Sequence, residues 1–335
     1  MRNVGKHPKC FMLLSFFLVI SALLVWSGVG FAIENPAGTT IDYTLTGDPN
    51  CTNYGMVETD KQEEHGMVVL GKDAETGESH YASNFGTVIT HKPISCGMYA
   101  YNGAMANNWG SIITYADYVN ISHGIYGNYG AYGMVASINS HIYNFGIIET
   151  KGSLGVGMYA DTGSTATNNS EGAITTYGSI AYGMYAEVDS TVINSGNIET
   201  KGDGAYGMYA NSGAKAINNG TITTEGDLSV DYFYTQGAYG MYVTGRGSEA
   251  TNNSEGIITT YGEWANGMVA EDGSIATNSG SIETNGAGAY GMFVNSGAKA
   301  TNESGGTITT YGDDGAHGML AWGYVEDNDV YRRST

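Results

Sequence analysis

Acidic side chains are the residues of this sequence best placed to do chemistry, because several of them recur at one repeat position. Three glutamates share an Ile-Glu-Thr motif: Glu149, Glu199 and Glu283. A second acidic pair, Asp313 and Asp314, lies close to His317. Two carboxyl groups that flank a sugar linkage cleave glycosidic bonds, so the pattern allows a polysaccharide-acting enzyme. The simpler interpretation, which we favour, is a solvated side chain that recurs because its repeat recurs.

Other signatures of catalysis are missing from the sequence. A serine protease nucleophile loop of the Gly-Asp-Ser-Gly type and the Gly-x-Ser-x-Gly motif of lipases do not occur. The seven histidines are scattered, and none has metal-ligand spacing to a cysteine or to another histidine. The Gly-x-Gly clusters are not followed by the amphipathic helix that a nucleotide site needs. We therefore expect no enzyme, no metal and no cofactor.

A repeat of about 24 to 27 residues determines where these side chains stand. The nine residues 194–202, Asn-Ser-Gly-Asn-Ile-Glu-Thr-Lys-Gly, recur in similar form at 144–152 and 278–286. A second block containing Gly-Met follows each of them. Both blocks occur ten times, with the methionines at 67, 98, 134, 158, 184, 208, 241, 268, 292 and 319. Some copies have a longer spacing between the asparagine and the isoleucine, as in 168–174 and 252–258.

Each repeat is predicted to be one coil of three short strands. The strands are Gly-x-Ile-x-Thr, then Ala-Tyr-Gly-Met-Tyr-Ala, then a run such as residues 214–218. Glycine is too frequent for helical repeats, because each glycine inside a helix costs about 1 kcal/mol relative to alanine. A coil buries its inner face only when a neighbour stacks on it. The fold class is therefore all-β, a single-stranded parallel β-helix, or β-solenoid, of about ten coils.

Stacking places equal positions of successive coils in columns about 4.8 Å apart. We expect the isoleucine and methionine columns to fill the core. We expect the asparagines to bond to one another at a left-handed corner, with the adjacent glycines at positive φ. One tyrosine column consists of Tyr99, Tyr159, Tyr185, Tyr209 and Tyr242. The alternation leaves open whether this column faces inward or outward.

The first 32 residues have the pattern of a secretory signal peptide. Arg2, Lys6 and Lys9 precede an apolar run over residues 11–26, and small residues lead to a cleavage site after Ala32. An uncleaved anchor is the alternative, but the run is shorter than the roughly 20 residues that a spanning helix needs. The predicted domains are a signal peptide at 1–32, a solenoid at 33–323 and a tail at 324–335. No membrane span is expected after cleavage.

Charge and cysteine content narrow the partners and the compartment. The formal charge of −20 repels nucleic acid and anionic lipid, so neither is an expected partner. Cys10 leaves with the signal peptide, and only Cys51 and Cys96 remain. They fall in different strands more than one and a half coils apart, an axial offset of about 8 Å. A disulfide needs a shorter Cα separation, so we expect two free thiols.

The repeats resemble the passenger region of bacterial autotransporters, the type V secretion system, over residues 50–322. The resemblance rests on the long signal peptide and on the Gly-x-Ile-x-Thr-x-Gly and Ala-Tyr-Gly-Met-Tyr-Ala coils. It implies a protein that is secreted or displayed on the surface of a Gram-negative cell. Such passengers include adhesins, proteases and esterases, so the resemblance predicts architecture better than activity. The translocator barrel that ends autotransporters does not follow residue 335 here, so the expected export partner is a barrel from a missing C-terminal part or a separate protein.

Two insertions interrupt the repeats, at 115–130 and 225–237, at the same corner of the third and seventh counted coils. Long loops on a rigid scaffold often bind ligands. The predicted ligand-binding residues are Tyr115, Tyr118, Tyr126, Tyr129, Asp227, Asp231, Tyr232, Phe233 and Tyr234. Four coils, about 19 Å, separate the insertions, so one extended glycan or protein could touch both. The alternative is that the loops cover the solenoid wall.

The sequence thus predicts a non-catalytic adhesive or structural surface module. The rival hypothesis is a polysaccharide-acting β-helix enzyme, either a lyase or a glycosidase.

Overall fold

The computed structural model describes residues 33–47, 50–61, 64–71, 76–116, 130–231, 234–313 and 315–322. The chain divides into two units, 1–30 and 31–335, and all the described residues belong to the second. The predicted signal peptide and the predicted tail lie outside the described residues. Within the described ranges, no helix has the length and the apolar character needed to cross a membrane.

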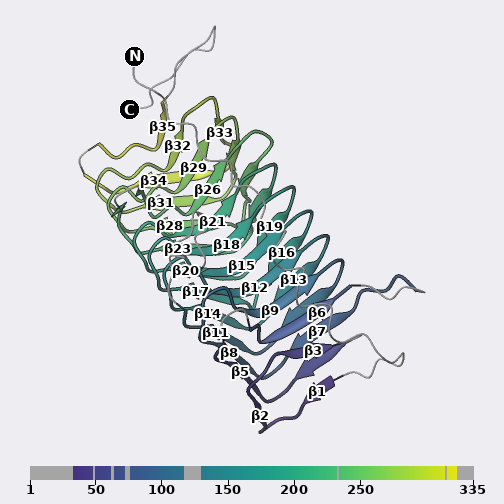
Figure 1. Cartoon of the computed structure of the whole chain (residues 1–335). Coiled ribbons are helices and arrows are strands. Elements are labelled where there is room, and N and C mark those ends of the chain that lie inside the picture. The colour runs from purple at the N-terminus through teal and green to yellow at the C-terminus, as the bar shows by residue number, and fades with distance from the viewer. Residues whose placement is uncertain are drawn as a thin grey trace, which may run out of the picture. The chain divides into compact units, whose positions relative to one another are not determined.

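Three parallel sheets of eleven strands each form the walls of the solenoid, and every coil contributes one strand to each sheet (Figure 1). Sheet A contains β1 (Ile33–Asn35), β4 (Cys51–Asn53), β7 (Tyr81–Asn84), β10 (Met105–Asn108), β13 (His141–Asn144), β16 (Thr165–Asn168), β19 (Thr191–Asn194), β22 (Lys215–Asn218), β27 (Glu249–Asn252), β30 (Ile275–Asn278) and β33 (Lys299–Asn302).

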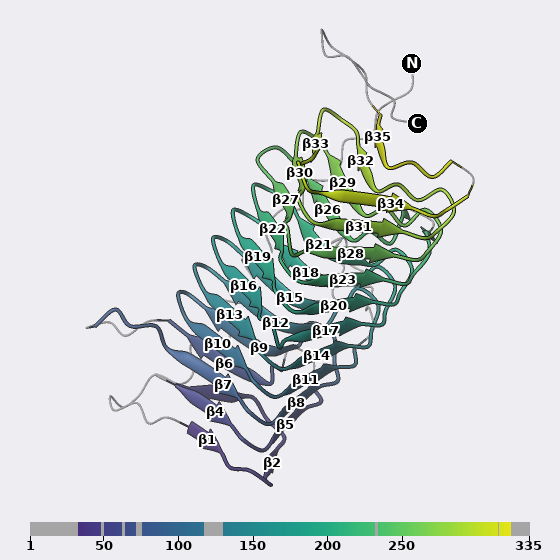
Figure 2. The same cartoon turned by 180° about the vertical axis from the view of Figure 1, so that it is seen from behind.

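Sheets B and C follow in the same order along the axis (Figure 2). Sheet B contains β2 (Thr40–Ile41), β5 (Met56–Thr59), β8 (Thr87–Thr90), β11 (Ser111–Thr114), β14 (Ile147–Thr150), β17 (Ala173–Thr176), β20 (Asn197–Thr200), β23 (Thr221–Thr224), β28 (Ile257–Thr260), β31 (Ser281–Thr284) and β34 (Thr307–Thr310). Sheet C contains β3 (Leu45–Gly47), β6 (Met67–Leu70), β9 (Cys96–Tyr101), β12 (Tyr132–Ser137), β15 (Val156–Asp161), β18 (Tyr182–Ala186), β21 (Tyr206–Ala210), β26 (Met241–Thr244), β29 (Met268–Glu271), β32 (Met292–Val294) and β35 (Met319–Ala321).

The predicted parallel β-helix is confirmed, with one more coil than the ten that the Gly-Met count gave. The additional coil is the first, β1 to β3, which pairs in register with β4 to β6. The count missed it because Leu45 stands where later coils have methionine, and because Asn35 precedes Asn53 by only 18 residues. Leu45 is buried like the methionines it replaces. The two insertions therefore belong to the fourth and eighth coils.

The isoleucine and methionine columns form the core, as predicted. The sheet B column is buried from Val57 to Ile282, and the sheet C column is buried from Met67 to Met292. At the last coil, Ile308 and Met319 are only partly buried. In the first coil Ile41 is partly buried as well, so burial of this core is least complete at the two ends of the stack.

The asparagine ladder runs through all eleven coils. The side-chain Nδ2 of each asparagine donates to the Oδ1 of its equivalent in the next coil, at 2.7–2.9 Å. Ten of the eleven side chains are buried, and only the terminal Asn302 is exposed. The expected left-handed corner was wrong: these asparagines end sheet A strands and none has positive φ. The ladder side chains point inward, and the strand residues before them are mostly partly exposed, as the alternation of a strand requires.

Glycine occurs beside the ladder asparagines for a different reason from the one expected. These glycines do not have positive φ. A Cβ on Gly220 would instead collide with the backbone of the preceding coil, namely the carbonyl oxygen of Gly196. Glycine is needed here because two backbones approach closely, and not because the turn is left-handed.

A threonine column at the end of the sheet B strands is buried together with its hydroxyl groups. Thr260 donates its hydroxyl to the carbonyl oxygen of Ala265 at 2.6 Å. The hydroxyl of Thr176 has no hydrogen-bond partner among the described residues. Both side chains are 0% exposed.

We expect opposite effects from Thr→Val substitutions in this column. Thr176→Val removes an unsatisfied hydroxyl and should leave the free energy of unfolding unchanged or raise it by about 1 kcal/mol. Thr260→Val orphans a buried carbonyl oxygen and should lower it by about 1–3 kcal/mol. Urea unfolding of the two variants measures the difference. Equal costs at the two positions would show that Thr176 has a partner in solution.

Cys51 and Cys96 are free, as predicted, because they lie in different sheets, and both are buried. Burial raises the pKa of the Cys51 thiol to about 12 and raises that of Cys96 further. Neither thiol is therefore a reactive thiolate near neutral pH.

Candidate functional site

The outer side of sheet C carries most of the aromatic residues of the central coils. The methionines of these strands point inward, so the residue after each methionine points outward. The tyrosine two residues before the methionine lies on the same outer side, because its ring contacts that of the tyrosine after the methionine: the ring centroids of Tyr182 and Tyr185 are 5.3 Å apart. This answers the question that the sequence left open. We call the resulting surface the tyrosine face, and define it as Tyr132, Tyr159, Tyr182, Tyr185, Tyr206, Tyr209, Tyr239 and Tyr242.

The rings of the tyrosine face contact one another in two adjacent columns. In one column, the ring centroids of Tyr159 and Tyr185 are 5.0 Å apart, and those of Tyr185 and Tyr209 are 4.8 Å apart. Tyr206, in the other column, lies 5.3 Å from Tyr242. Most of the rings are tilted relative to their neighbours, so their faces are not covered as they would be in a parallel stack. Mutual packing leaves most of these side chains partly buried.

A row of acids and amides borders the tyrosine face at the carboxyl ends of the strands. We call it the polar row: Ser137, Asp161, Glu187, Asn211, Thr244, Glu271 and Asn295. Each member stands three residues after a core methionine. The Tyr159 hydroxyl donates to Glu187 at 2.9 Å, and the Tyr242 hydroxyl donates to Glu271 at 2.8 Å.

The amide side chains of the polar row form further hydrogen bonds with the tyrosines and with a neighbouring acid. Asn211 Nδ2 donates to the hydroxyl oxygens of Tyr185 and Tyr209, and Asn295 Nδ2 donates to Glu271 at 2.8 Å. Hydrogen bonds and ring contacts therefore join the tyrosines and the polar row into one surface. The sequence contained a signal for the polar row, because its members all stand three residues after the methionine of a Gly-Met pair.

Two neighbouring carboxyl groups of the polar row have raised pKa values. Burial raises the pKa of Glu187, and the negative charge of Asp161 adds to this effect, against the hydrogen bond from Tyr159. Burial also raises the pKa of Asp161, against hydrogen bonds from Thr162 and Ser137. Carboxyl groups with raised pKa values on a ligand-accessible face are characteristic of functional sites, although ion networks produce them too. Sequence reasoning missed this pair because the residue type at this offset from the methionine changes from coil to coil.

His65 stands two residues before Met67 and beside Tyr99, and burial lowers its pKa to about 4. Its Nδ1 accepts a hydrogen bond from the Cys96 backbone N–H at 3.0 Å, which requires an unprotonated nitrogen. In the unfolded chain histidine titrates near pH 6.5. Between pH 6.5 and 4, His65 is therefore protonated in the unfolded state but stays neutral in the folded state.

We expect His65 to make the protein less stable as the pH falls from 6.5 to 4, by about 3 kcal/mol in total. A His65→Phe variant should lack this component and differ from the parent by a pH-dependent amount. Urea unfolding of both proteins at pH 7, 5.5 and 4 measures it. A constant difference over that range would contradict the shifted pKa.

The sequence-predicted ligand residues are only partly within the described chain. Tyr115 follows β11, is 45% exposed and stacks on His91 with ring centroids 5.2 Å apart. Asp227 accepts a hydrogen bond from the Glu263 backbone N–H and donates its own N–H to Asp203. Asp231 pairs with Tyr234 in the backbone register of the antiparallel hairpin β24 (Ser229–Asp231) and β25 (Tyr234–Gln236). The others lie outside the described residues: Tyr118, Tyr126, Tyr129, Tyr232 and Phe233.

The repeated glutamates of sheet B lie apart from the tyrosine face. Glu149 pairs with Lys151 at 2.7 Å and Glu199 with Lys201 at 3.0 Å, all of them partly exposed. Asn285 donates to Glu283 at 3.2 Å. His317 stacks on Tyr290, while Asp314 lies outside the described residues. Within the part of the chain that is described, no cluster of three His, Cys, Asp or Glu side chains has the arrangement of a metal site.

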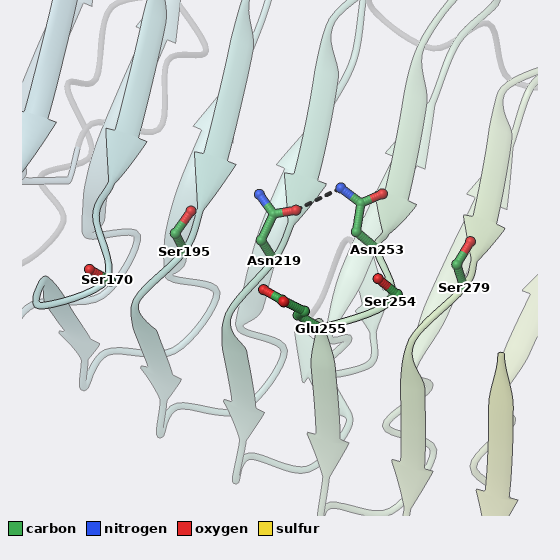
Figure 3. A pocket seen from close by; sticks show the side chains of 7 residues that line it. All are labelled: Ser170, Ser195, Asn219, Asn253, Ser254, Glu255 and Ser279. Carbon is green, nitrogen blue, oxygen red and sulfur yellow. Dashed lines mark hydrogen bonds between the residues drawn. The ribbon is translucent and has the colours of Figure 1, made fainter. Parts of the chain in front are cut away.

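A polar hollow of about 640 Å³ lies at the corner between sheets A and B (Figure 3). We call it the corner trough. Its lining consists of Ser170, Ser195, Asn219, Asn253, Ser254, Glu255 and Ser279. Asn253 Nδ2 donates to the Asn219 side chain at 2.6 Å, the contact drawn in Figure 3. No residue was predicted there from the sequence.

Comparisons with known proteins agree with this architecture. Residues 169–253 and 244–325 each match the model of the family described as the BigA third pectate lyase-like domain. Among solved structures, a chain of the complex between Vag8 and C1 inhibitor is similar, with a TM-score of 0.58 and 16% sequence identity. The likeness covers 88% of this chain and 72% of that one. No curated protein matches the chain in sequence.

At 16% identity the Vag8 likeness establishes the fold alone. Vag8 is an autotransporter passenger, and the two family matches together span the sixth to eleventh coils. The repeat motifs had indicated the same resemblance independently. The chain therefore forms a parallel β-helix of the kind found in autotransporter passengers.

Proposed function

We propose that this protein is a non-catalytic module, secreted or displayed on a Gram-negative cell surface, that binds an extended glycan or protein along its tyrosine face. The observation that carries the proposal is the surface that the tyrosines and the polar row form through ring contacts and hydrogen bonds. Partly buried rings offer apolar contact area at a small entropic cost, and their hydroxyl groups offer polar contacts. The adjacent carboxyl and amide groups pair with hydroxyl or amide groups of a ligand.

The predicted loop residues fit the same surface by their position in the chain. The insertion at 115–130 leads directly into β12, and the insertion at 225–237 leads towards β26. Both strands carry rings of the tyrosine face. We propose that a ligand on this face is also contacted by the loop tyrosines and aspartates. Vag8 in the related structure is in complex with C1 inhibitor, which supports a protein as one class of partner.

Binding by the chain without its signal peptide tests the proposal. Residues 33–335 are applied to arrays of host glycans and to host cells, next to Tyr185→Ala and Asn211→Ala variants. Tyr261→Ala is the matched control, because Tyr261 is 55% exposed at a different corner, beyond β28. We expect both face variants to bind at least tenfold less tightly than the parent and the control to bind as the parent does. Binding that survives both face variants, in proteins with parental circular dichroism, would refute this site.

A polysaccharide-acting enzyme is the second candidate, favoured by Asp161 and Glu187. Their raised pKa values on neighbouring coils suit one carboxyl group as a proton donor. Incubation with neutral and acidic polysaccharides, followed by assays for reducing ends and for the unsaturated product of a lyase, decides between the two functions. Turnover that Glu187→Gln abolishes would establish the enzyme and refute the non-catalytic proposal.

For export we propose an outer-membrane translocator barrel, encoded either with this chain or separately. The DNA that follows the codon for Thr335, together with the neighbouring genes, tests this. Surface display that needs no barrel gene would contradict it.

A further inference from the structure

The corner trough exists because one column of side chains changes character along the solenoid. The residue after each ladder asparagine points outward at the corner between sheets A and B. In the second to fifth coils this column is aromatic: Tyr54, Phe85, Trp109 and Phe145. In the seventh, eighth and tenth coils it contains Ser195, Asn219 and Ser279, which are much smaller. The small side chains leave space where the aromatic coils are filled.

The aromatic half of the column is a stack of rings that joins the coils. Phe85 and Trp109 have centroids 6.3 Å apart at an interplanar angle of 7°, and Trp109 and Phe145 have centroids 3.8 Å apart at 4°. Stacking covers part of each ring, and Phe85 and Trp109 each remain 48% exposed. These rings fill the corner that is hollow in the polar half.

In the polar half of the column, longer corners form the two walls of the trough and shorter corners form its floor. Six residue steps separate Asn168 from Ile174 and Asn252 from Ile258, whereas four separate Asn194 from Ile198. The longer corners of the sixth and ninth coils bring Ser170 and Ser254 to the edges of the trough. Ser195 and Asn219 lie on the shorter corners between them (Figure 3). The distance between the walls is three coil spacings, about 14 Å.

The lining selects one class of ligand by its chemistry. Hydroxyl and amide groups both donate and accept hydrogen bonds, as the hydroxyl groups of a sugar do. The pairing of Asn253 with Asn219 fixes both side-chain amides before a ligand arrives, which lowers the entropic cost of binding. Glu255 adds a negative charge, its side chain is directed towards the coil of Asn219, and the lining contains no basic residue.

We propose that the corner trough binds a short segment of an uncharged, hydroxyl-rich oligosaccharide, lying along the solenoid axis. This site is separate from the tyrosine face, and the inference does not depend on the function proposed for that face. Glu255 and the net charge of −20 exclude uronates, sialylated glycans and phosphates. The trough volume lies within the range of about 300–1,000 Å³ that is usual for small-molecule sites.

The aromatic half of the same column supplies a blocking variant that should fold. Ser195→Phe places in the seventh coil the side chain that the fifth coil already carries at this position, and it should fill the floor of the trough. Glu303→Phe makes the same kind of change at the same column position in the eleventh coil, outside the trough lining. Asn211→Ala disturbs the tyrosine face instead. These three variants separate the trough from every other surface considered.

The experiment is titration calorimetry of residues 33–335 with cellotetraose, maltotetraose and chitotetraose, and with tetragalacturonate as the anionic counterpart. We expect at least one neutral tetrasaccharide to bind, Ser195→Phe to weaken it at least tenfold, and Glu303→Phe and Asn211→Ala to leave it unchanged. Tetragalacturonate should not bind the parent. Loss of binding in Asn211→Ala but not in Ser195→Phe would place the sugar on the tyrosine face and overturn the proposal. Failure of all three neutral probes, or preference for the uronate, would overturn it as well.

Discussion

Asn194→Ala is expected to lower the free energy of unfolding by about 2–5 kcal/mol. Asn194 Nδ2 donates to Asn218 at 2.9 Å, and its Oδ1 accepts from Asn168 at 2.8 Å. The substitution removes both ladder bonds in a site that is 0% exposed and leaves polar atoms of two neighbours without their ladder partner. Buried polar groups that lose a partner cost more than the bond itself contributed. Urea unfolding followed by circular dichroism measures the change.

The same column provides the control for this prediction. Asn302 ends the ladder, accepts only from Asn278 and is exposed, so Asn302→Ala should cost no more than about 1 kcal/mol. Hydrogen exchange measures which strands lose stability in the Asn194→Ala variant. Protection of the backbone amides should fall first in β16, β19 and β22, because a solenoid coil depends on its direct neighbours. Equal costs for the two variants would show that the ladder adds nothing beyond surface hydrogen bonds.

Gly183→Ala is expected to be the other strongly destabilising change, at about 1–3 kcal/mol or more. The glycine before the sheet C methionine lies against the next coil. A Cβ on Gly183 would be 2.5 Å from the carbonyl oxygen of Gly207 and would overlap the Cγ2 atom of Ile198. Ile198 is fully buried and the carbonyl oxygen belongs to the backbone, so neither atom has room to move away. The methyl group should therefore force two stacked coils apart.

Gly318 occupies the same position in the last described coil, where no further coil of the described chain lies against it. A Cβ there would have its nearest contact, the Cγ2 atom of Ile308, at 3.8 Å, and its φ is not positive. Gly318→Ala should therefore be neutral, or stabilising by up to about 1 kcal/mol through the unfolded chain. Thermal and urea unfolding of the two alanine variants compare them directly. If Gly318→Ala costs as much as Gly183→Ala, the glycine is needed for local backbone conformation and not for coil stacking.

These two predictions also explain the motif that first revealed the repeat. Gly-Met recurs because the methionine fills the core and because glycine, which has no side chain, lets the following coil pack closely. The sequence alone assigned a role to the methionine but none to the glycine, because the contact that forbids a side chain comes from a residue one coil away. The glycine beside the asparagine follows the same logic, and a turn with positive φ was the wrong reason for it.

The sequence by itself determined the coil, its three strands and the inward columns of isoleucine and methionine, because a strand alternates with a period of two and the repeat restates that alternation many times. It did not reveal the first coil, where Leu45 and the short spacing from Asn35 to Asn53 depart from the repeat. Its candidate site residues came from the two long insertions at 115–130 and 225–237.

The tertiary structure decided which surfaces can act together. Tyr185 and Tyr209, Asp161 and Glu187, and Ser195 and Asn219 are each 24 or 26 positions apart in the chain and lie on neighbouring coils. Stacking at about 4.8 Å turns such distant residues into direct neighbours, so a tyrosine in one repeat becomes part of a face and a serine becomes the floor of a trough. Each repeat read alone carries only one member of these sets. The candidate sites therefore belong to the columns, and a column exists only once the coils have stacked.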